Sequence, residues 1–142
     1  MGAYKYIQET LQKEYADKNR VYKDKTKAWR NGPVMEKVER PANLPRARRL
    51  GYKAKQGYVV VRVRIRKGGA RKARPRAGRR PRALGVTRFT RSMSLKRIAE
   101  RKASKKYPNL RVLSSYYVWE DGTNHWFETI MRDPHNPVSA EN

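Results

Sequence analysis

The feature that most constrains this 142-residue sequence is a stretch of sixty residues, 40–99, which contains 21 Lys and Arg residues and no Asp or Glu. The whole chain has 36 basic and 12 acidic residues, a net charge of +24, so nearly all of the excess lies in this stretch. A solvated protein surface normally mixes both signs of charge, because interspersed acids relieve repulsion. The stretch therefore predicts a polyanionic partner, which solubility alone would not require.

Composition narrows the class of protein further. Hydrophobic residues make up 37% of the chain, which allows a small core that leaves part of the chain outside it. The absence of cysteine excludes disulfides and thiolate metal sites and is typical of a reducing compartment. No apolar run approaches the roughly 20 residues of a membrane span, and the first residues lack the apolar region of a signal peptide. We expect a single domain, 1–142, with no membrane partner.

Apolar periodicity predicts an α+β fold: a small antiparallel sheet with flanking helices and an irregular, highly basic extension. Gly, Pro and Asn mark the breaks between the segments. From these patterns we expect an N-terminal helical region (1–32), an irregular basic crossing segment (33–57), a strand (58–67), an extended basic arm (68–92), a helix plus β-hairpin (94–134) and a tail (135–142).

The strand reads YVVVRVRIR over residues 58–66 and alternates between apolar and basic side chains. Period two places four apolar residues on one face: Val59, Val61, Val63 and Ile65. We expect this face to pack on the core. Guanidinium groups match phosphate oxygens, so we expect the opposite face to hold a phosphate backbone through Arg62, Arg64 and Arg66. The alternative is that these arginines simply line the solvent side of a half-buried strand.

The basic arm has no periodicity between residues 70 and 83, where Arg, Lys, Pro, Gly and Ala dominate. Such a composition cannot bury enough apolar area to order itself, and it suits a segment that folds on contact with nucleic acid. We therefore expect residues 68–92 to be disordered in the free protein. A localisation signal or heparin-like patch is the alternative, but it explains about five to eight basic residues better than sixty acid-free ones.

A helical pattern and two strands follow the arm. Ser94 is the expected N-cap of the helix and Pro108 ends it. One side of this helix is apolar, with Leu95, Ile98, Ala99 and Ala103. Strands are expected over 109–119 and 125–131, and the Asp-Gly turn signal between them predicts a hairpin.

Catalytic and metal chemistry have little support. A triad of Asp121, His125 and Ser114 or Ser115 can be constructed, but the Asp-Gly turn explains Asp121 more simply. A metal-dependent nuclease needs clustered carboxylates beside the basic groove, and the basic stretch has none. The chain has only two distant histidines, which make a weak metal site. We expect no enzymatic activity, no cofactor, no metal and no small-molecule substrate.

Several stretches resemble one protein family: MGAYKYI (1–7), ARRLGYKAKQG (47–57), VVVRVRIRKG (59–68) and NLRVLSSYYV (109–118). Together they are similar to the archaeal and eukaryotic large-subunit ribosomal protein L-fifteen-e (eL-fifteen), and RKARPRAGRRPRALGVTRFTR (71–91) resembles its archaeal form. The resemblance implies a structural constituent of the large subunit in cytoplasmic ribosomes, with extensions buried in ribosomal RNA and neighbouring ribosomal proteins as secondary partners. Family members usually continue into a further basic C-terminal tail, whose contacts cannot be assigned here.

By position, the resemblance also implies RNA contacts in the crossing segment, at Arg46, Arg48, Arg49, Tyr52, Lys53, Lys55 and Gln56. The charge pattern adds contacts on the strand and the arm, at Arg62, Arg64, Arg66, Lys67, Arg71, Lys72, Arg74, Arg76, Arg79, Arg80, Arg82, Arg88 and Arg91. Whether Tyr52 and Tyr58 stack on bases or pack internally stays open. The alternative functions are histone-like DNA compaction, which charge alone permits, and an RNA-modifying or RNA-cleaving enzyme.

Overall fold

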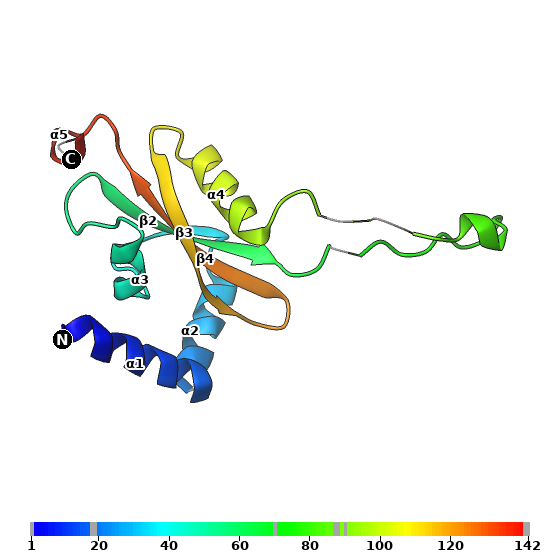
Figure 1. Ribbon diagram of the computed structural model, residues 1–142, viewed down its shortest axis with the longest axis horizontal. Helices are drawn as coiled ribbons and strands as arrows, with labels where there is room; N and C mark the ends of the chain where they lie inside the picture. The colour runs from blue at the N-terminus through cyan, green and yellow to red at the C-terminus, as the bar shows by residue number, and fades with distance from the viewer. Residues whose placement is uncertain (1, 18–19, 70, 87–88, 90, 141–142) are drawn as a thin grey trace.

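The computed structural model describes residues 2–17, 20–69, 71–86, 89 and 91–140 (Figure 1). The described residues form an α+β protein with five helices and a four-stranded antiparallel sheet, which confirms the predicted α+β class with an antiparallel sheet and flanking helices. Along the chain the elements are α1 (Ala3–Asp17), α2 (Arg20–Asn31), β1 (Met35–Val38), α3 (Leu44–Arg49), β2 (Tyr58–Arg66), the 3₁₀ turn η1 (Pro81–Ala83), α4 (Leu95–Lys106), β3 (Arg111–Glu120), β4 (Asn124–Arg132) and α5 (Pro137–Ala140).

The strands lie in the order β1-β2-β4-β3, so β2 and β4 are central and β3 is an edge. The longest pairing runs between β2 and β4, from Tyr58 opposite Arg132 to Arg66 opposite Asn124. β3 and β4 form the predicted hairpin, with irregularities in register near both ends. In its turn the Asp121 carboxylate accepts hydrogen bonds from the backbone N–H groups of Thr123 (2.7 Å) and Asn124 (2.5 Å), as an Asp-Gly turn predicts.

α4 covers one face of the sheet (Figure 1). The Ser94 hydroxyl accepts a hydrogen bond from the backbone N–H of Arg97 (3.3 Å) and caps the helix as predicted. Ala99 and Ala103 are fully buried, and their small side chains let the helix lie close to the sheet. They pack against the predicted apolar face of β2 and against β4, in a core made of Val61, Val63, Ile65, Phe127 and Met131.

The opposite face of the sheet is also covered, contrary to the expectation of an open arginine face on β2. A second core lies there and consists of Ala47, Tyr116, Val118, Trp126 and Ile130, with Trp29 and Tyr52 packed against it. α2 and α3 supply Trp29 and Ala47, so two helices close this face. Arg62 and Arg64 are therefore half-buried beneath this layer, whereas Arg66, at the end of β2, is exposed.

The crossing segment 33–57 is not irregular throughout, which corrects a second expectation. β1 pairs with β2, with Met35 opposite Val63. α3 begins at an N-cap, where the Asn43 side chain accepts a hydrogen bond from the backbone N–H of Arg46 (3.0 Å) and Pro45 lies in the first turn. Both elements are short, so they are not stable until their apolar residues pack against the rest of the fold.

The tail expected from residue 135 onward contains a short helix, α5, that packs on the body. Ser139 is fully buried. It lies against Gly57, where a Cβ atom would come within 2.6 Å of the Ser139 Cβ. Gly57 also has a φ of +85°, a conformation that side chains disfavour. The backbone N–H of Asp133 donates to the Gly57 carbonyl (2.8 Å). This hydrogen bond links the end of β4 to the start of β2.

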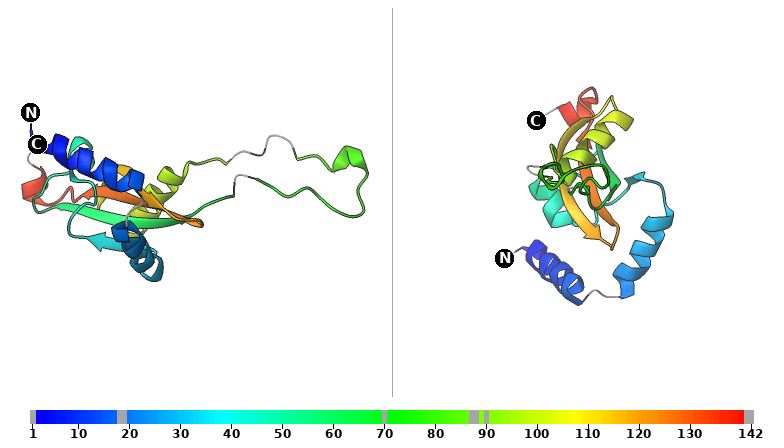
Figure 2. Two further views of the ribbon diagram at one scale, coloured as in Figure 1. Left: turned by 90° about the horizontal axis from the view of Figure 1, so that it is seen from below. Right: turned by 90° about the vertical axis from the view of Figure 1, so that its right-hand side faces the viewer.

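Residues 71–86 lie beyond the end of the sheet in Figures 1 and 2, and η1 is the one regular element described among them. Gly68 and Gly69 have φ angles of +85° and +76° where the chain leaves β2. Two left-handed residues in succession turn a strand sharply, and glycine adopts that conformation without a steric penalty. No helix of the described residues is long and apolar enough to cross a membrane.

Candidate nucleic-acid interface

The first basic surface lies on α3 and the loop after it. Pro45 and Ala47 are buried, and Ala47 anchors the helix to the second core. The residues between and after them point outward and are exposed, namely Arg46, Arg48 and Arg49. Among the described residues no carboxylate forms an ion pair with these three arginines. α3 therefore presents three uncompensated charges on a helix that is fixed at its base.

The loop after α3 continues this surface. Lys53 and Gln56 are exposed and Lys55 is half-buried. Tyr52 is half-buried and packs against the second core, which favours the packing alternative for this ring. Tyr58 is half-buried at the start of β2. We call residues 46–56 the α3 surface.

The second basic surface is the arm, residues 71–86. Its exposed basic side chains are Arg71, Lys72, Arg74, Arg76, Arg79, Arg80 and Arg82. Two of them donate hydrogen bonds to nearby carbonyl groups, Arg74 to Leu84 (3.1 Å) and Arg79 to Ala77 (3.2 Å). No described carboxylate forms an ion pair with any of the seven. Arg91 is half-buried, and Arg88 lies outside the described residues.

The basic residues of β2 have a different environment. The side chain of Arg62 is only 13% exposed, and its Nη2 atom lies 3.0 Å from Oε1 of Glu128. The Arg62 guanidinium also lies over the Trp29 ring, 4.4 Å from its centroid. Glu36 adds a weaker ion pair at 3.9 Å. Arg62 is thus held inside the protein between an aromatic ring and a carboxylate.

Glu128 joins several elements to this arginine. Its side chain is fully buried and accepts hydrogen bonds from the backbone N–H of Ala42 (2.9 Å) and from the Tyr116 hydroxyl. Burial and the neighbouring carboxylate raise the pKa of Tyr116, which keeps the hydroxyl protonated as a donor. The carboxylate therefore ties together β2, β3, β4 and the residue before the Asn43 N-cap. We call Arg62, Glu128, Tyr116 and Trp29 the buried node.

Two further predicted contacts have intramolecular partners. Arg64 donates hydrogen bonds to the carbonyl oxygens of Trp29 (3.3 Å) and Arg30 at the end of α2. Lys67 pairs with Glu120 at 3.1 Å. Arg66 is exposed. The acid partners lie outside residues 40–99, so a stretch that is acid-free in sequence meets acids in space.

Sequence reasoning missed Glu128 as a structural centre. The available signal was a carboxylate in the otherwise apolar run WFETIM of β4, since a buried acid requires a partner. The identity of the partner could not be inferred from the sequence, because Arg62 is 66 residues away.

The residues of the possible triad do not assemble. The Ser115 hydroxyl donates to Glu100 (2.5 Å), and Nδ1 of His125 lies 2.9 Å from Glu120. Burial lowers the pKa of His125. Asp121 is occupied by its own turn and by Arg30 at 3.1 Å. Among the described residues no group of three or more His, Asp or Glu side chains could hold a metal ion.

The fold and these surfaces define a small, strongly basic α+β protein with exposed basic residues on the short helix α3 and on residues 71–86. The sequence matches the Ribosomal L15e family, described as Ribosomal L15, over residues 2–142, and the chain belongs to this family. Membership makes it a structural, non-enzymatic protein of the large ribosomal subunit. The predicted family and the predicted lack of enzymatic activity are both confirmed by this match.

Proposed function

We propose that the chain stabilises large-subunit ribosomal RNA by binding its phosphate backbone with the α3 surface and the arm. The observation that carries this proposal is the set of exposed basic residues on these two surfaces that have no described acid partner. Uncompensated charge of one sign repels itself, and phosphates supply the missing negative charge. Guanidinium groups bind phosphate oxygens in pairs, which suits the predominance of arginine.

The two surfaces contribute in different ways. The α3 surface is anchored by the second core, so its arginines are pre-positioned and lose little freedom on binding. The arm makes few internal contacts and adapts its path to the RNA as it binds. We assign Arg62 and the half-buried Arg64 a structural role, in which they hold α2 on the sheet. Arg66, Lys67 and Arg91 lie near the base of the arm, where they can still approach RNA.

The remaining predictions extend this proposal. Residues 71–91 resemble the archaeal form of the family, and we propose that the chain is of that form. Neighbouring ribosomal proteins are proposed as secondary partners. Arg88 is kept among the proposed RNA contacts on the strength of its sequence alone.

Salt dependence tests the mechanism. About ten phosphate contacts give a log–log slope of roughly −7 to −9 for binding to fragments of large-subunit ribosomal RNA. The measurement is the affinity at several salt concentrations, with duplex DNA as competitor at matched salt. A slope near zero would rule out charge neutralisation, and equal affinity for duplex DNA would favour the DNA-compacting alternative.

A further inference from the structure

α4 carries a third basic surface, which lies on the face of the sheet opposite α3 (Figure 1). Its exposed basic residues are Lys96, Arg97, Arg101, Lys102 and Lys105. Arg97, Arg101 and Lys105 follow one another at intervals of four residues and form a row with a rise of about 6 Å per step. Like charges at this spacing destabilise a helix. The row is therefore unfavourable in the free protein and favourable only beside negative charge.

The one acid of α4 does not neutralise this row. Glu100 is half-buried and accepts a hydrogen bond from the Ser115 hydroxyl of β3 (2.5 Å). Among the described residues no ion pair joins it to Arg97 or Arg101. Lys106 differs from the row, because it donates to the Met35 carbonyl (3.1 Å).

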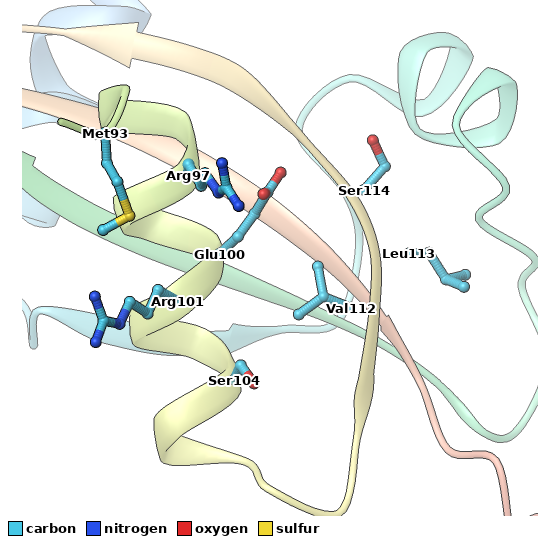
Figure 3. A pocket seen from close by; sticks show the side chains of 8 residues that line it. All are labelled: Met93, Arg97, Glu100, Arg101, Ser104, Val112, Leu113 and Ser114. Atoms are coloured by element: carbon cyan, nitrogen blue, oxygen red, sulfur yellow. The ribbon is translucent and has the colours of Figure 1, made fainter.

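Beside the row lies a groove of about 610 Å³ between α4 and the edge strand β3 (Figure 3). Arg97 and Arg101 line it from the helix, and Leu113 and Ser114 line it from the strand. The Glu100 carboxylate also lines the groove, where it accepts the hydrogen bond from Ser115. Ser104 and Ser114 add hydroxyl groups that donate to phosphate or ribose oxygens, and Val112 and Met93 add apolar surface. The groove thus combines cations, hydroxyls and apolar patches, which are the contacts that a sugar–phosphate backbone with its bases requires.

We propose that this α4 groove is a second RNA-binding site, and that the protein bridges two segments of RNA across its sheet. The inference rests on the proposed function, because it assumes that the α3 surface faces ribosomal RNA. The two surfaces are separated by the sheet and by the helices α3 and α4, and each helix is about 10 Å across. One RNA strand lying on the α3 surface therefore cannot also fill the groove without folding back around the protein.

Directed hydroxyl-radical cleavage tests the bridge, because the chain has no cysteine and a single one can be introduced. Ser104→Cys places an iron chelate in the groove, and Ala54→Cys places it on the α3 surface. Each labelled full-length protein is bound to intact large-subunit ribosomal RNA. The expected result is cleavage from both positions, at two separate RNA segments.

The outcomes separate the two proposals. Cleavage from position 54 but none from 104, or cleavage of the same nucleotides from both, overturns the bridge and leaves the proposed function standing. No cleavage from either position contradicts the proposed function and the bridge with it. When the same labelled protein is assembled into large subunits, cleavage of a neighbouring ribosomal protein from position 104 without RNA cleavage would show that the groove binds protein and would overturn its assignment to RNA.

A paired charge variant provides a second test. Arg97→Gln with Arg101→Gln removes two proposed contacts, and we expect the affinity for ribosomal RNA at about 0.1 M salt to fall at least tenfold and the salt slope to change by about 1.4–1.8. The melting temperature should stay the same or rise, because two like charges leave the helix. Lys23→Gln with Lys27→Gln removes the same charge at the same spacing from α2, and an equal loss of affinity there would contradict a specific site.

Discussion

At the scale of single residues, the buried node shows how one basic residue of the acid-free stretch is used inside the protein. Arg62 has a carboxylate on one side and an indole ring on the other, and each of its partners belongs to a different element. Removing one member of a buried pair leaves the other charged group without compensation. The node is therefore expected to matter for stability more than any exposed charge.

We predict that Glu128→Gln lowers the free energy of unfolding by about 3–5 kcal/mol. The amide keeps the shape of the side chain but leaves Arg62 without its buried counter-ion. Denaturant unfolding followed by tryptophan fluorescence measures the change, since Trp29 belongs to the node and Trp126 packs beside it.

Glu36→Gln is the matched control, because Glu36 pairs with the same arginine at 3.9 Å and its side chain is 51% exposed. An exposed pair contributes less than about 1 kcal/mol. Similar losses for the two variants would show that burial does not determine the strength of the interaction.

Asp121 predicts a dependence on pH. Burial on its own raises the pKa of this carboxyl group, but hydrogen bonds from the backbone N–H groups of Asn124 and Thr123 outweigh it and lower the pKa to about 2. A lowered pKa in the folded state stabilises the protein above the unfolded pKa, near 3.8, and this contribution disappears as the pH falls toward 2.

Asp121→Asn keeps an oxygen that accepts the turn hydrogen bonds but removes the charge. We expect the wild type to exceed this variant by about 1–2 kcal/mol in unfolding free energy at pH 5 to 6, and the gap to close toward pH 2. Thermal or urea unfolding across this range measures the gap. A difference that stays constant with pH would mean that the carboxylate charge has no part in the stability of the hairpin.

At the scale of elements, local patterns predicted the N-terminal helices, β2, α4 and the hairpin, whereas β1 and α3 depend on tertiary contacts. α4 has its own N-cap and apolar side, and the hairpin has its own turn, so their signals lie within a few residues of each other. β1 and α3 have four and six residues, which is too short to be stable without partners. An N-cap residue followed by proline, as at Asn43 and Pro45, is nevertheless a sequence signal for the start of a helix.

The candidate site also has one part that could be predicted from the sequence and one part that could not. The charge of the arm and of α3 could be predicted from composition, because it needs no knowledge of neighbours. The intramolecular contacts of Arg62 and Arg64 could not be predicted, because their partners come from α2 and β4. The basic row on α4 lies partly outside the acid-free stretch, and the sequence places Glu100 among its residues. Only the structure shows that Glu100 accepts a hydrogen bond from Ser115 and that, among the described residues, it forms no ion pair with the row.

The junction of Gly57 with α5 makes the third prediction. Gly57→Ala forces a side chain into a positive φ and brings its Cβ within 2.6 Å of Ser139. We expect a loss of about 2–3 kcal/mol in unfolding free energy, measured by denaturant unfolding. Gly51→Ala is the control, because its φ is +96° but the nearest atom, on Leu113, is 4.0 Å away. It should cost only about 1 kcal/mol, and equal costs would show that the contact with Ser139 adds nothing.

At the scale of the whole molecule, the residues that form the cores are separate from those of the arm. Both cores lie on the sheet and its helices, and the arm contributes no residue to either. If the arm binds RNA as proposed, we expect its charge to affect the RNA complex without affecting the folding of the body. The α3 surface differs, because the residues that anchor it are also part of the second core.

Replacing Arg74, Arg76, Arg79 and Arg80 together by Gln separates the two properties. The unfolding free energy should stay within about 0.5 kcal/mol of the wild type, because these side chains are exposed and lie outside the cores. The salt slope for ribosomal RNA should become shallower by roughly 3, since each lost phosphate contact removes about 0.7–0.9. Salt-dependent binding and urea unfolding on the same preparation measure both quantities.

The matched control removes four exposed charges from α1, α2 and β1 by changing Lys13, Lys23, Lys27 and Lys37 to Gln. Both variants have the same net charge, so a difference between them reports where the charge lies. If RNA reads only the total charge, the two slopes will change equally and the arm has no special role. If the arm follows the RNA backbone, the control slope will change by less than about 1, and only the arm variant will show the loss of roughly 3 in slope.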